Sequence, residues 1–258
     1  MERIQPRRTR GISSGGVRLW GMLFVLLGAV GQSLIQNRIL GLSQPGGPGL
    51  EALLEANPAM MSYVTTAVVL MTLETCAVPI FAFLISNGMQ HTANVKRYML
   101  RVLGIAALAE IPYNLVTADK LLDVTSRNPA FGLVFAMIAI NLCMDHPEKT
   151  IKHRLIRIFV TVCSALWCSM LRITYGGALV IIACVLWAFR AKPSYRNLAG
   201  AAASVVCSLS SMFFVAAPMG FMAVMLHNGE EGDGNRYVNY LAYPAILLAV
   251  FLTGKFLM

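Results

Sequence analysis

The chain has 258 residues, of which 57% are hydrophobic, and its mean hydropathy of +0.65 indicates a protein that lies largely in lipid. Its formal net charge is +9, but the basic residues are spread over several loops that flank apolar runs and are not interleaved with aromatic residues on one face. This distribution argues against a nucleic-acid-binding protein, because membrane insertion and attraction to anionic lipid explain it.

Eight apolar runs follow one another along the chain. A helix needs roughly 20 apolar residues to cross the hydrocarbon core of a bilayer, and the runs lack the alternation of apolar and polar residues that barrel strands require. The expected fold class is therefore all-α, a polytopic transmembrane helical bundle of eight or nine spans. The predicted spans are residues 17–35, 61–86, 95–117, 129–144, 155–170, 176–188, 198–226 and 237–256.

The first run is interpreted as a retained helix and not as a secretory signal, because no small-residue cleavage pattern follows it. Residues 1–16 are expected to form a basic cytoplasmic tail, and residues 17–258 a single transmembrane domain without an internal repeat. An external segment is expected at about 36–60. Its turn residues at 45–49 precede an apolar and acidic stretch, which predicts a short helix on the membrane surface.

The orientation of the bundle is predicted from the basic residues, which are retained on the cytoplasmic side during insertion. Fifteen of the 21 Lys and Arg residues precede or open alternate spans, which places the N-terminus in the cytoplasm. These fifteen residues are Arg3, Arg7, Arg8, Arg10, Arg18, Lys96, Arg97, Arg101, Lys149, Lys152, Arg154, Arg157, Arg190, Lys192 and Arg196.

The seventh run, 198–226, is too long for one straight helix and contains Pro218 and Gly220. A proline interrupts a helix because its ring obstructs the carbonyl group four residues earlier. The run therefore forms one bent helix or two short helices, and the side on which the C-terminus lies depends on which of the two is formed.

All six cysteines fall inside apolar runs. Buried thiols of this kind act as small packing groups, and no zinc-ligand spacing is present. We therefore expect neither a disulfide framework nor a metal site.

Two carboxylates lie at membrane depth, where a charged group needs a partner, a proton or a water-filled cavity. Glu74 is near the middle of the second span, and Glu110 is followed by Pro112, which should kink its helix. Asn114 lies four residues after Glu110, so both share one face and could line a cavity. Either carboxylate is also explained by a packing hydrogen bond or an ion pair, and Arg38, Arg127 and Arg172 are candidate partners.

The second span leads into a polar connection that contains His91. A histidine there could transfer protons at neutral pH, although a loop histidine is usually just solvated. In a helix that starts near Asn94, Arg97 and Arg101 lie one turn apart on the same face, which suits a phosphate or pyrophosphate group. The same basic residues are also typical of ordinary anchoring on the cytoplasmic side.

The order of several motifs resembles that of the TraX family of membrane proteins. The resemblance covers most of the chain after the first loop and is most specific between the second and third spans. The matching motifs are Val78 to Thr92, then Tyr98 and Arg101, Glu110 to Leu115, Leu171 to Gly177, His227 to Gly229, and Tyr240 to Pro244.

This resemblance implies an acetyltransferase, because the family is named for a conjugation protein associated with acetylation of the pilin N-terminus. It also implies a bacterial plasma membrane, acetyl-CoA as the cytoplasmic co-substrate, and a membrane-associated or envelope acceptor such as a peptide amine, a glycan or a lipid head group. The partners expected are thus membrane lipid and that acceptor, with no nucleic acid.

The resemblance further implies roles for particular residues. Lys96, Arg97 and Arg101 would hold the cofactor phosphates, and His91 or Glu110 would act as the base. Asn114, Tyr175, Arg172 and Glu74 would polarise or orient the substrate. His91 is predicted on the cytoplasmic side and Glu110 on the outer side, so they can act on one acceptor only across a deep solvated cleft.

The chain also departs from the family pattern. Relatives carry an Asp-His pair where this sequence has Gly28 and Ala29, a histidine where it has Ala245, and an acidic residue where it has Asn87. The alternative is therefore a non-enzymatic membrane protein, such as a small proton-coupled transporter that uses Glu74 and Glu110, or a partner in an envelope assembly.

Overall fold

The computed structural model describes residues 11–42, 49–145, 150–230 and 236–257. Within these ranges the chain is helical and contains no strand, which confirms the all-α transmembrane bundle. Four arginines of the N-terminal tail, Lys149 and most of the turn at 45–49 lie outside the described residues.

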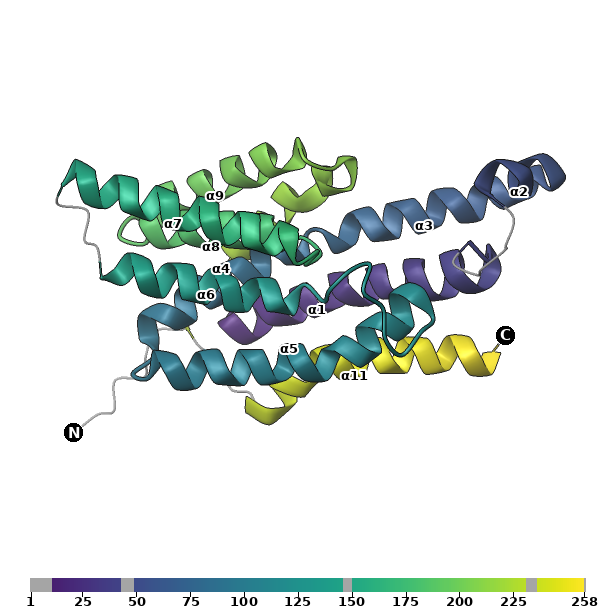
Figure 1. Ribbon diagram of the computed structural model, residues 1–258, viewed down its shortest axis with the longest axis horizontal. Helices are drawn as coiled ribbons and strands as arrows, with labels where there is room; N and C mark the ends of the chain where they lie inside the picture. Colours follow the sequence, from purple (N-terminus) through teal and green to yellow (C-terminus); the bar gives the residue numbers. More distant parts are fainter. Residues whose placement is uncertain (1–10, 43–48, 146–149, 231–235, 258) are drawn as a thin grey trace.

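The first half of the chain forms the longest helices (Figure 1). Among the described residues, three segments are long and apolar enough to cross a membrane, namely Ser14–Ile39, Pro58–His91 and Val95–Ala118. Their elements are α1 (Ser14–Ala29), the π-helix η1 (Val30–Ile39) that continues it, α2 (Leu50–Ala56), η2 (Pro58–Met60), α3 (Met61–Glu74), α4 (Ala77–His91) and α5 (Val95–Ala118).

The second half forms the remaining described helices. Its elements are α6 (Ala130–Met144), α7 (Ile151–Met170), α8 (Gly176–Ala188), α9 (Pro193–Ser208), the 3-10 helix η3 (Met212–Gly220), α10 (Phe221–Met225) and α11 (Arg236–Leu257). α8 is apolar on all sides and is buried among α4, α6, α7 and α9, as expected for a helix without a polar face.

The second predicted span is divided at Thr75 and Cys76 into α3 and α4. Pro79 lies in the first turn of α4, where its ring obstructs the carbonyl group of Thr75 and prevents a continuous helix. The Thr75 hydroxyl group donates to the Thr72 carbonyl at 2.7 Å, and the Cys76 thiol donates to the Ala216 carbonyl at 3.1 Å. Side chains at the break therefore replace part of the lost helical hydrogen bonding.

Pro112 disturbs its helix less than Pro79 does. α5 continues through it without interruption, and Figure 1 shows the second half of the helix bending toward α1. The predicted kink is thus a bend and not a break.

The seventh run, 198–226, forms two short helical segments and not one bent helix. α9 ends at Ser208, and η3 with α10 returns alongside it (Figure 1). After α10 the chain reaches the N-terminal segment, where Ile12 and His227 form a short parallel bridge. α11 therefore begins after the chain has returned to α1, and Figure 1 shows it running toward the opposite end of the bundle.

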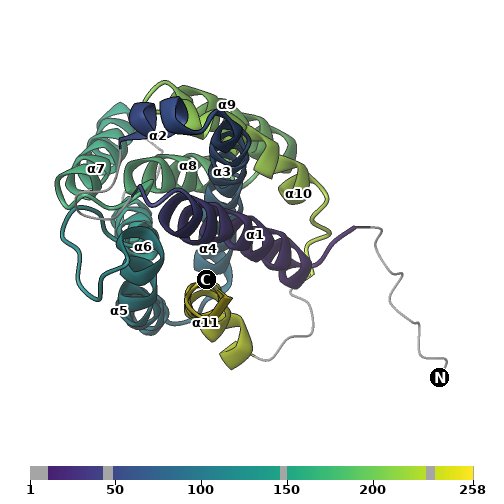
Figure 2. The same cartoon turned by 90° about the vertical axis from the view of Figure 1, so that its right-hand side faces the viewer.

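α1 and α4 lie in the middle of the bundle when it is viewed from one end (Figure 2). On one side, α4 packs with α6 and α8 around the fully buried Ile80, Met137 and Ile182. On the other side, α1 meets α5 and α11 in a second apolar cluster that contains Val25 and Leu247. The space between these two clusters holds the candidate site.

Candidate functional site

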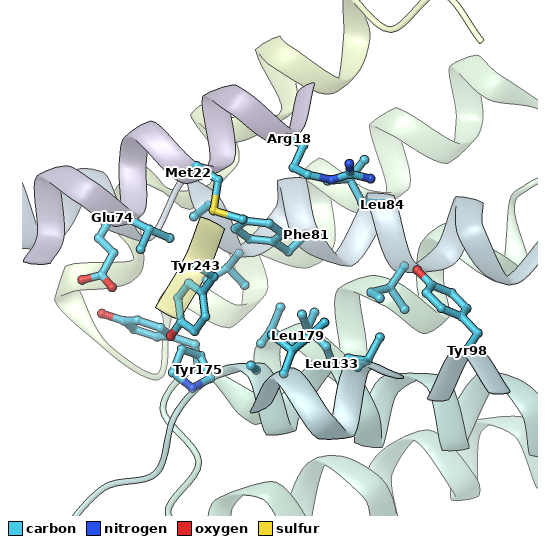
Figure 3. Close-up of a pocket in the computed structure, with 18 residues that line it drawn as sticks. Arg18, Met22, Glu74, Phe81, Leu84, Tyr98, Leu133, Tyr175, Leu179 and Tyr243 are labelled. Atoms are coloured by element: carbon cyan, nitrogen blue, oxygen red, sulfur yellow. The ribbon is translucent and has the colours of Figure 1, made fainter. Parts of the chain in front are cut away.

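A cavity of about 160 Å³ lies between α1, α4, α5, α6, α8 and α11, and the last residue of α3 also lines it. Figure 3 shows it as an elongated space lined mainly by apolar side chains. These include Met22, Val25, Phe81, Leu84, Leu133 and Leu179. A cavity with such a lining suits an extended, largely apolar group.

The polar side chains of the cavity lie at its two ends. Glu74, Tyr175 and Tyr243 gather at one end, and Figure 3 shows the Glu74 carboxylate directed toward the tyrosine hydroxyl groups. Arg18 and Tyr98 lie at the other end. The cavity thus joins an acidic, hydroxyl-rich end to a basic end.

Glu74 is the last residue of α3 and is half-buried. Among the described residues its carboxylate has neither a salt-bridge nor a hydrogen-bond partner. Two of its candidate partners are engaged elsewhere: Arg38 pairs with Asp119 at 2.7 Å, and Arg127 lies 3.4 Å from Glu110. An unpaired carboxylate at membrane depth is costly and typical of a functional group.

Gly28 on α1 faces Glu74 directly. A Cβ atom at Gly28 would overlap the Glu74 carboxylate, so the close approach of α1 and α3 requires a glycine there. α1 changes to π-helix just beyond this contact, and insertions of this type are frequent at functional sites. A second, smaller cavity lies here and shares Glu74 and Tyr243 with the first.

Tyr175 enters the cavity from a turn with unusual backbone geometry. Arg172 and Tyr175 have φ angles of 56° and 55°, in the left-handed region that non-glycine residues rarely adopt. Arg127 holds the turn, since its N–H donates to the Arg172 carbonyl at 2.8 Å and its carbonyl accepts from Thr174 N–H at 3.0 Å. The hydroxyl groups of Tyr113 and Thr174 share a 2.6 Å hydrogen bond. Such strain persists where surrounding contacts enforce it, often at functional sites.

Tyr243 is positioned by a chain of hydrogen bonds that ends at Glu110. Its hydroxyl group donates to Asn128 Oδ1 at 2.9 Å. The backbone N–H of Asn128 donates to Glu110 Oε2 at 3.2 Å, and its side-chain amide donates to the Ala106 carbonyl at 3.1 Å. Glu110 itself lines neither cavity. In this arrangement its carboxylate orders the loop that holds Tyr243.

The structure brings together some of the site residues predicted from the sequence and separates others. Glu74 and Tyr175 meet in the cavity, whereas Asn114 and Arg172 do not line it. Asn114 is buried, and its amide nitrogen donates to the Leu121 carbonyl at 3.4 Å. The Arg172 side chain is exposed.

The predicted phosphate-binding residues lie around the turn between α4 and α5. α5 begins after the Asn94 cap, whose side chain accepts from Arg97 N–H at 2.9 Å, so the predicted helix start is observed. His91 Nδ1 lies 2.9 Å from the Asn87 carbonyl oxygen. Four predicted site residues have exposed side chains that do not line the cavity, namely His91, Lys96, Arg97 and Arg101. Tyr98 of α5 does line it.

Three polar residues of the cavity are not among the site residues predicted from the sequence, namely Arg18, Tyr98 and Tyr243. In the sequence, Arg18 is explained by membrane orientation alone, and the two tyrosines stand out only as parts of the family motifs. Tyr243 precedes Pro244 within an apolar run, and this polar group in the last span was the one available signal.

Residues 57–253 match the family model described as TraX protein, and this match covers more than half of the chain. The chain belongs to the TraX family. The match includes Glu74, Tyr175 and Tyr243, but begins after α1, so Arg18 and Gly28 of this TraX protein lie outside it. No curated protein and no solved structure matches the chain.

Proposed function

We propose that this TraX protein is a membrane-embedded acyltransferase that moves an acetyl group from cytoplasmic acetyl-CoA to a membrane-associated or envelope acceptor. The observation that carries the proposal is the unpaired Glu74 carboxylate opposite the hydroxyl groups of Tyr175 and Tyr243, at one end of a mainly apolar cavity. Acyl transfer needs a base and hydrogen-bond donors at one point, shielded from competing water.

In the proposed reaction, an amine or hydroxyl group of the acceptor attacks the thioester carbonyl carbon, and Glu74 takes its proton. The Tyr175 hydroxyl group donates a hydrogen bond to the carbonyl oxygen, on which negative charge develops, whereas the Tyr243 hydroxyl group already donates to Asn128. The carbon–sulfur bond then breaks, and the thiolate leaves and takes up the proton. Glu74 thereby fills the role of base that the family resemblance had implied for His91 or Glu110.

The proposed orientation places the turn between α4 and α5 in the cytoplasm of a bacterium, with the N-terminus on the same side of the plasma membrane. The exposed Lys96, Arg97 and Arg101 then attract the polyanionic donor. Their separation from the cavity assigns them to recruitment of the donor and not to chemistry.

The decisive experiment compares Glu74→Gln with Glu55→Gln, a matched change of an exposed carboxylate in α2. Membranes that contain each variant are incubated with radiolabelled acetyl-CoA, and label in the envelope fraction is counted. Loss of a general base is expected to reduce transfer about 100-fold or more, while Glu55→Gln retains it. Equal transfer by Glu74→Gln and wild type would overturn the assignment of the base.

One observation favours a second candidate, a proton-coupled transporter. Glu74 and Tyr243 line both cavities, so the carboxylate lies between two spaces. In a transporter it would accept a proton from one space and release it to the other. Reconstituted vesicles separate the two functions, because a transporter dissipates an imposed pH gradient in a Glu74-dependent way and an acyltransferase does not.

A further inference from the structure

We propose that Arg18 binds the phosphate group of an extended ligand whose opposite end reaches Glu74. The inference rests on the proposed function and deepens it, since it assigns the anchor of the donor to α1 and not to the exposed basic residues of α5. It concerns a residue outside the part of the chain that matches the family model.

Arg18 is the one basic residue among those that line the cavity within the described chain. It has no salt bridge to any carboxylate in the described ranges. Figure 3 shows its guanidinium group near Leu84, on the side of Tyr98 and away from Glu74. The guanidinium N–H groups of Arg18 are therefore available to donate hydrogen bonds to an anion at the edge of the apolar cavity.

The backbone around Arg18 is held by several contacts, so the start of α1 has a fixed place in the bundle. Ser13 caps α1 by accepting from Gly16 N–H at 3.4 Å, and Val17 is fully buried. Ile12 N–H donates to the Leu226 carbonyl at 2.7 Å. Preorganisation of this kind lowers the entropy lost when a ligand binds.

The chemistry of the cavity limits what the ligand can be. A guanidinium group binds phosphate oxygens in a bidentate manner. The walls between the two ends are mainly apolar, so a free, fully hydrated phosphate gains little there, whereas a phosphate carried on a chain can lay that chain along Met22, Phe81 and Leu133. Both acetyl-CoA and an anionic phospholipid offer this chemistry.

The test uses the full-length protein in nanodiscs of zwitterionic phosphatidylcholine, with acetyl-CoA as the probe and calorimetry as the readout. Loss of a charged hydrogen-bonding partner in Arg18→Gln is expected to weaken binding about tenfold or more. Arg18→Lys keeps the charge but loses the bidentate guanidinium group, so its affinity for acetyl-CoA should lie between those of wild type and Arg18→Gln. Arg154→Gln changes an exposed arginine of α7 that does not line the cavity, and should bind as wild type.

A second arm identifies the source of the phosphate. Native mass spectrometry of nanodiscs that also contain phosphatidylglycerol counts the anionic lipids retained by wild type and by Arg18→Gln. An Arg18-dependent loss of lipid with unchanged acetyl-CoA affinity upholds the phosphate site and assigns it to a lipid head group.

The possible failures are distinguishable. If Arg18→Gln is folded, as judged by thermal unfolding, and binds both probes like wild type, the Arg18 site is overturned while the proposed function stands. If wild type binds no acetyl-CoA, the proposed function fails, and Arg18-dependent lipid retention alone would uphold the site. If wild type binds neither probe, both proposals are overturned.

Discussion

Glu74 and Glu110 are carboxylates within the helical bundle, and they have opposite surroundings. Glu110 accepts a hydrogen bond from Asn128 N–H and pairs with Arg127, while Glu74 faces a cavity. A carboxylate that is satisfied by its neighbours stabilises them, and one that is left open can take a proton or orient a substrate. We therefore assign a structural role to Glu110.

The structural role of Glu110 predicts the effect of Glu110→Gln. The substitution removes the ion pair with the half-exposed Arg127 and weakens the bond to Asn128, so the free energy of unfolding should fall by about 1 kcal/mol. Transfer activity should fall only in proportion to the folded fraction. Thermal unfolding in detergent, beside Glu55→Gln as the control, measures the change.

The opposite result would be equally informative. A Glu110→Gln protein that unfolds at the wild-type temperature but transfers no acetyl group would make Glu110 a participant in the reaction, as the family resemblance had implied.

At the residue scale, the sequence predicts that Glu74 and Tyr175 belong to the site but not that they meet. Their meeting depends on a strained turn at 171–175 and on Gly28, which lets α1 approach Glu74. Contacts between residues this far apart in the chain depend on how the helices pack, and no local pattern encodes that. The sequence does not mark Arg18 as a site residue, because membrane insertion by itself explains a basic residue beside a span.

At the element scale, two interruptions of the helices face each other. The first, at Thr75 and Cys76, divides α3 from α4, and the second is the 3-10 segment η3 that ends at Gly220. A Cβ atom at Gly220 would overlap the carbonyl oxygen of Cys76, so the two backbones touch here without intervening side chains. The carbonyl groups of Phe213 and Ala216 in η3 accept hydrogen bonds from Thr75 and Cys76.

This contact predicts that Gly220→Ala destabilises the protein by about 1–3 kcal/mol, because a backbone atom must move to admit the methyl group. Gly104→Ala in α5 is the matched control, since no heavy atom lies within 4 Å of the added Cβ, and alanine is the better helix former. The unfolding temperatures of the two variants should therefore differ clearly. Equal unfolding temperatures would show that η3 is free to move away from Cys76.

The positions of most helices were predictable from the sequence, because runs of apolar residues mark where the chain is helical. Residues 176–188, for example, were predicted as a span and form α8. The break at Thr75 was missed because it lies inside an apolar run, where composition gives no signal. Pro79 is the local cause, but a proline near a helix start is also compatible with an unbroken, bent helix.

At the scale of the whole molecule, the beginning and the later part of the chain are joined beside the cavity. His227 Nδ1 lies 3.2 Å from the Ile12 carbonyl oxygen, and the imidazole packs edge-on against Phe83. Arg196 lies over the same phenyl ring, 4.8 Å from its centre. The segment that precedes α1 is therefore fixed to the turn that follows α10.

This junction predicts a dependence of stability on pH. Burial lowers the pKa of His227 below its usual value of 6.5, and the nearby Arg196 lowers it further, against the opposing effect of the hydrogen bond to Ile12. The folded state thus holds the proton less tightly than the unfolded state, so its full stability is present above pH 6.5 and is lost as the pH falls through the lower, folded pKa.

Thermal unfolding between about pH 8 and about pH 5 measures this dependence. His227→Gln keeps a hydrogen-bonding side chain but cannot titrate, so its unfolding temperature should change less across this range. A wild type and a His227→Gln variant with the same pH dependence would exclude His227 as the group responsible.

The junction between Ile12 and residues 226–228 also joins two parts of the chain that are synthesised at different times. α1 leaves the ribosome long before residues 226–228, which fix its start, have been translated. Tyr243 of α11 is synthesised later still. Until α11 has been translated, a nascent chain therefore carries Arg18 and Glu74 without Tyr243, and the full lining of the cavity exists only afterwards.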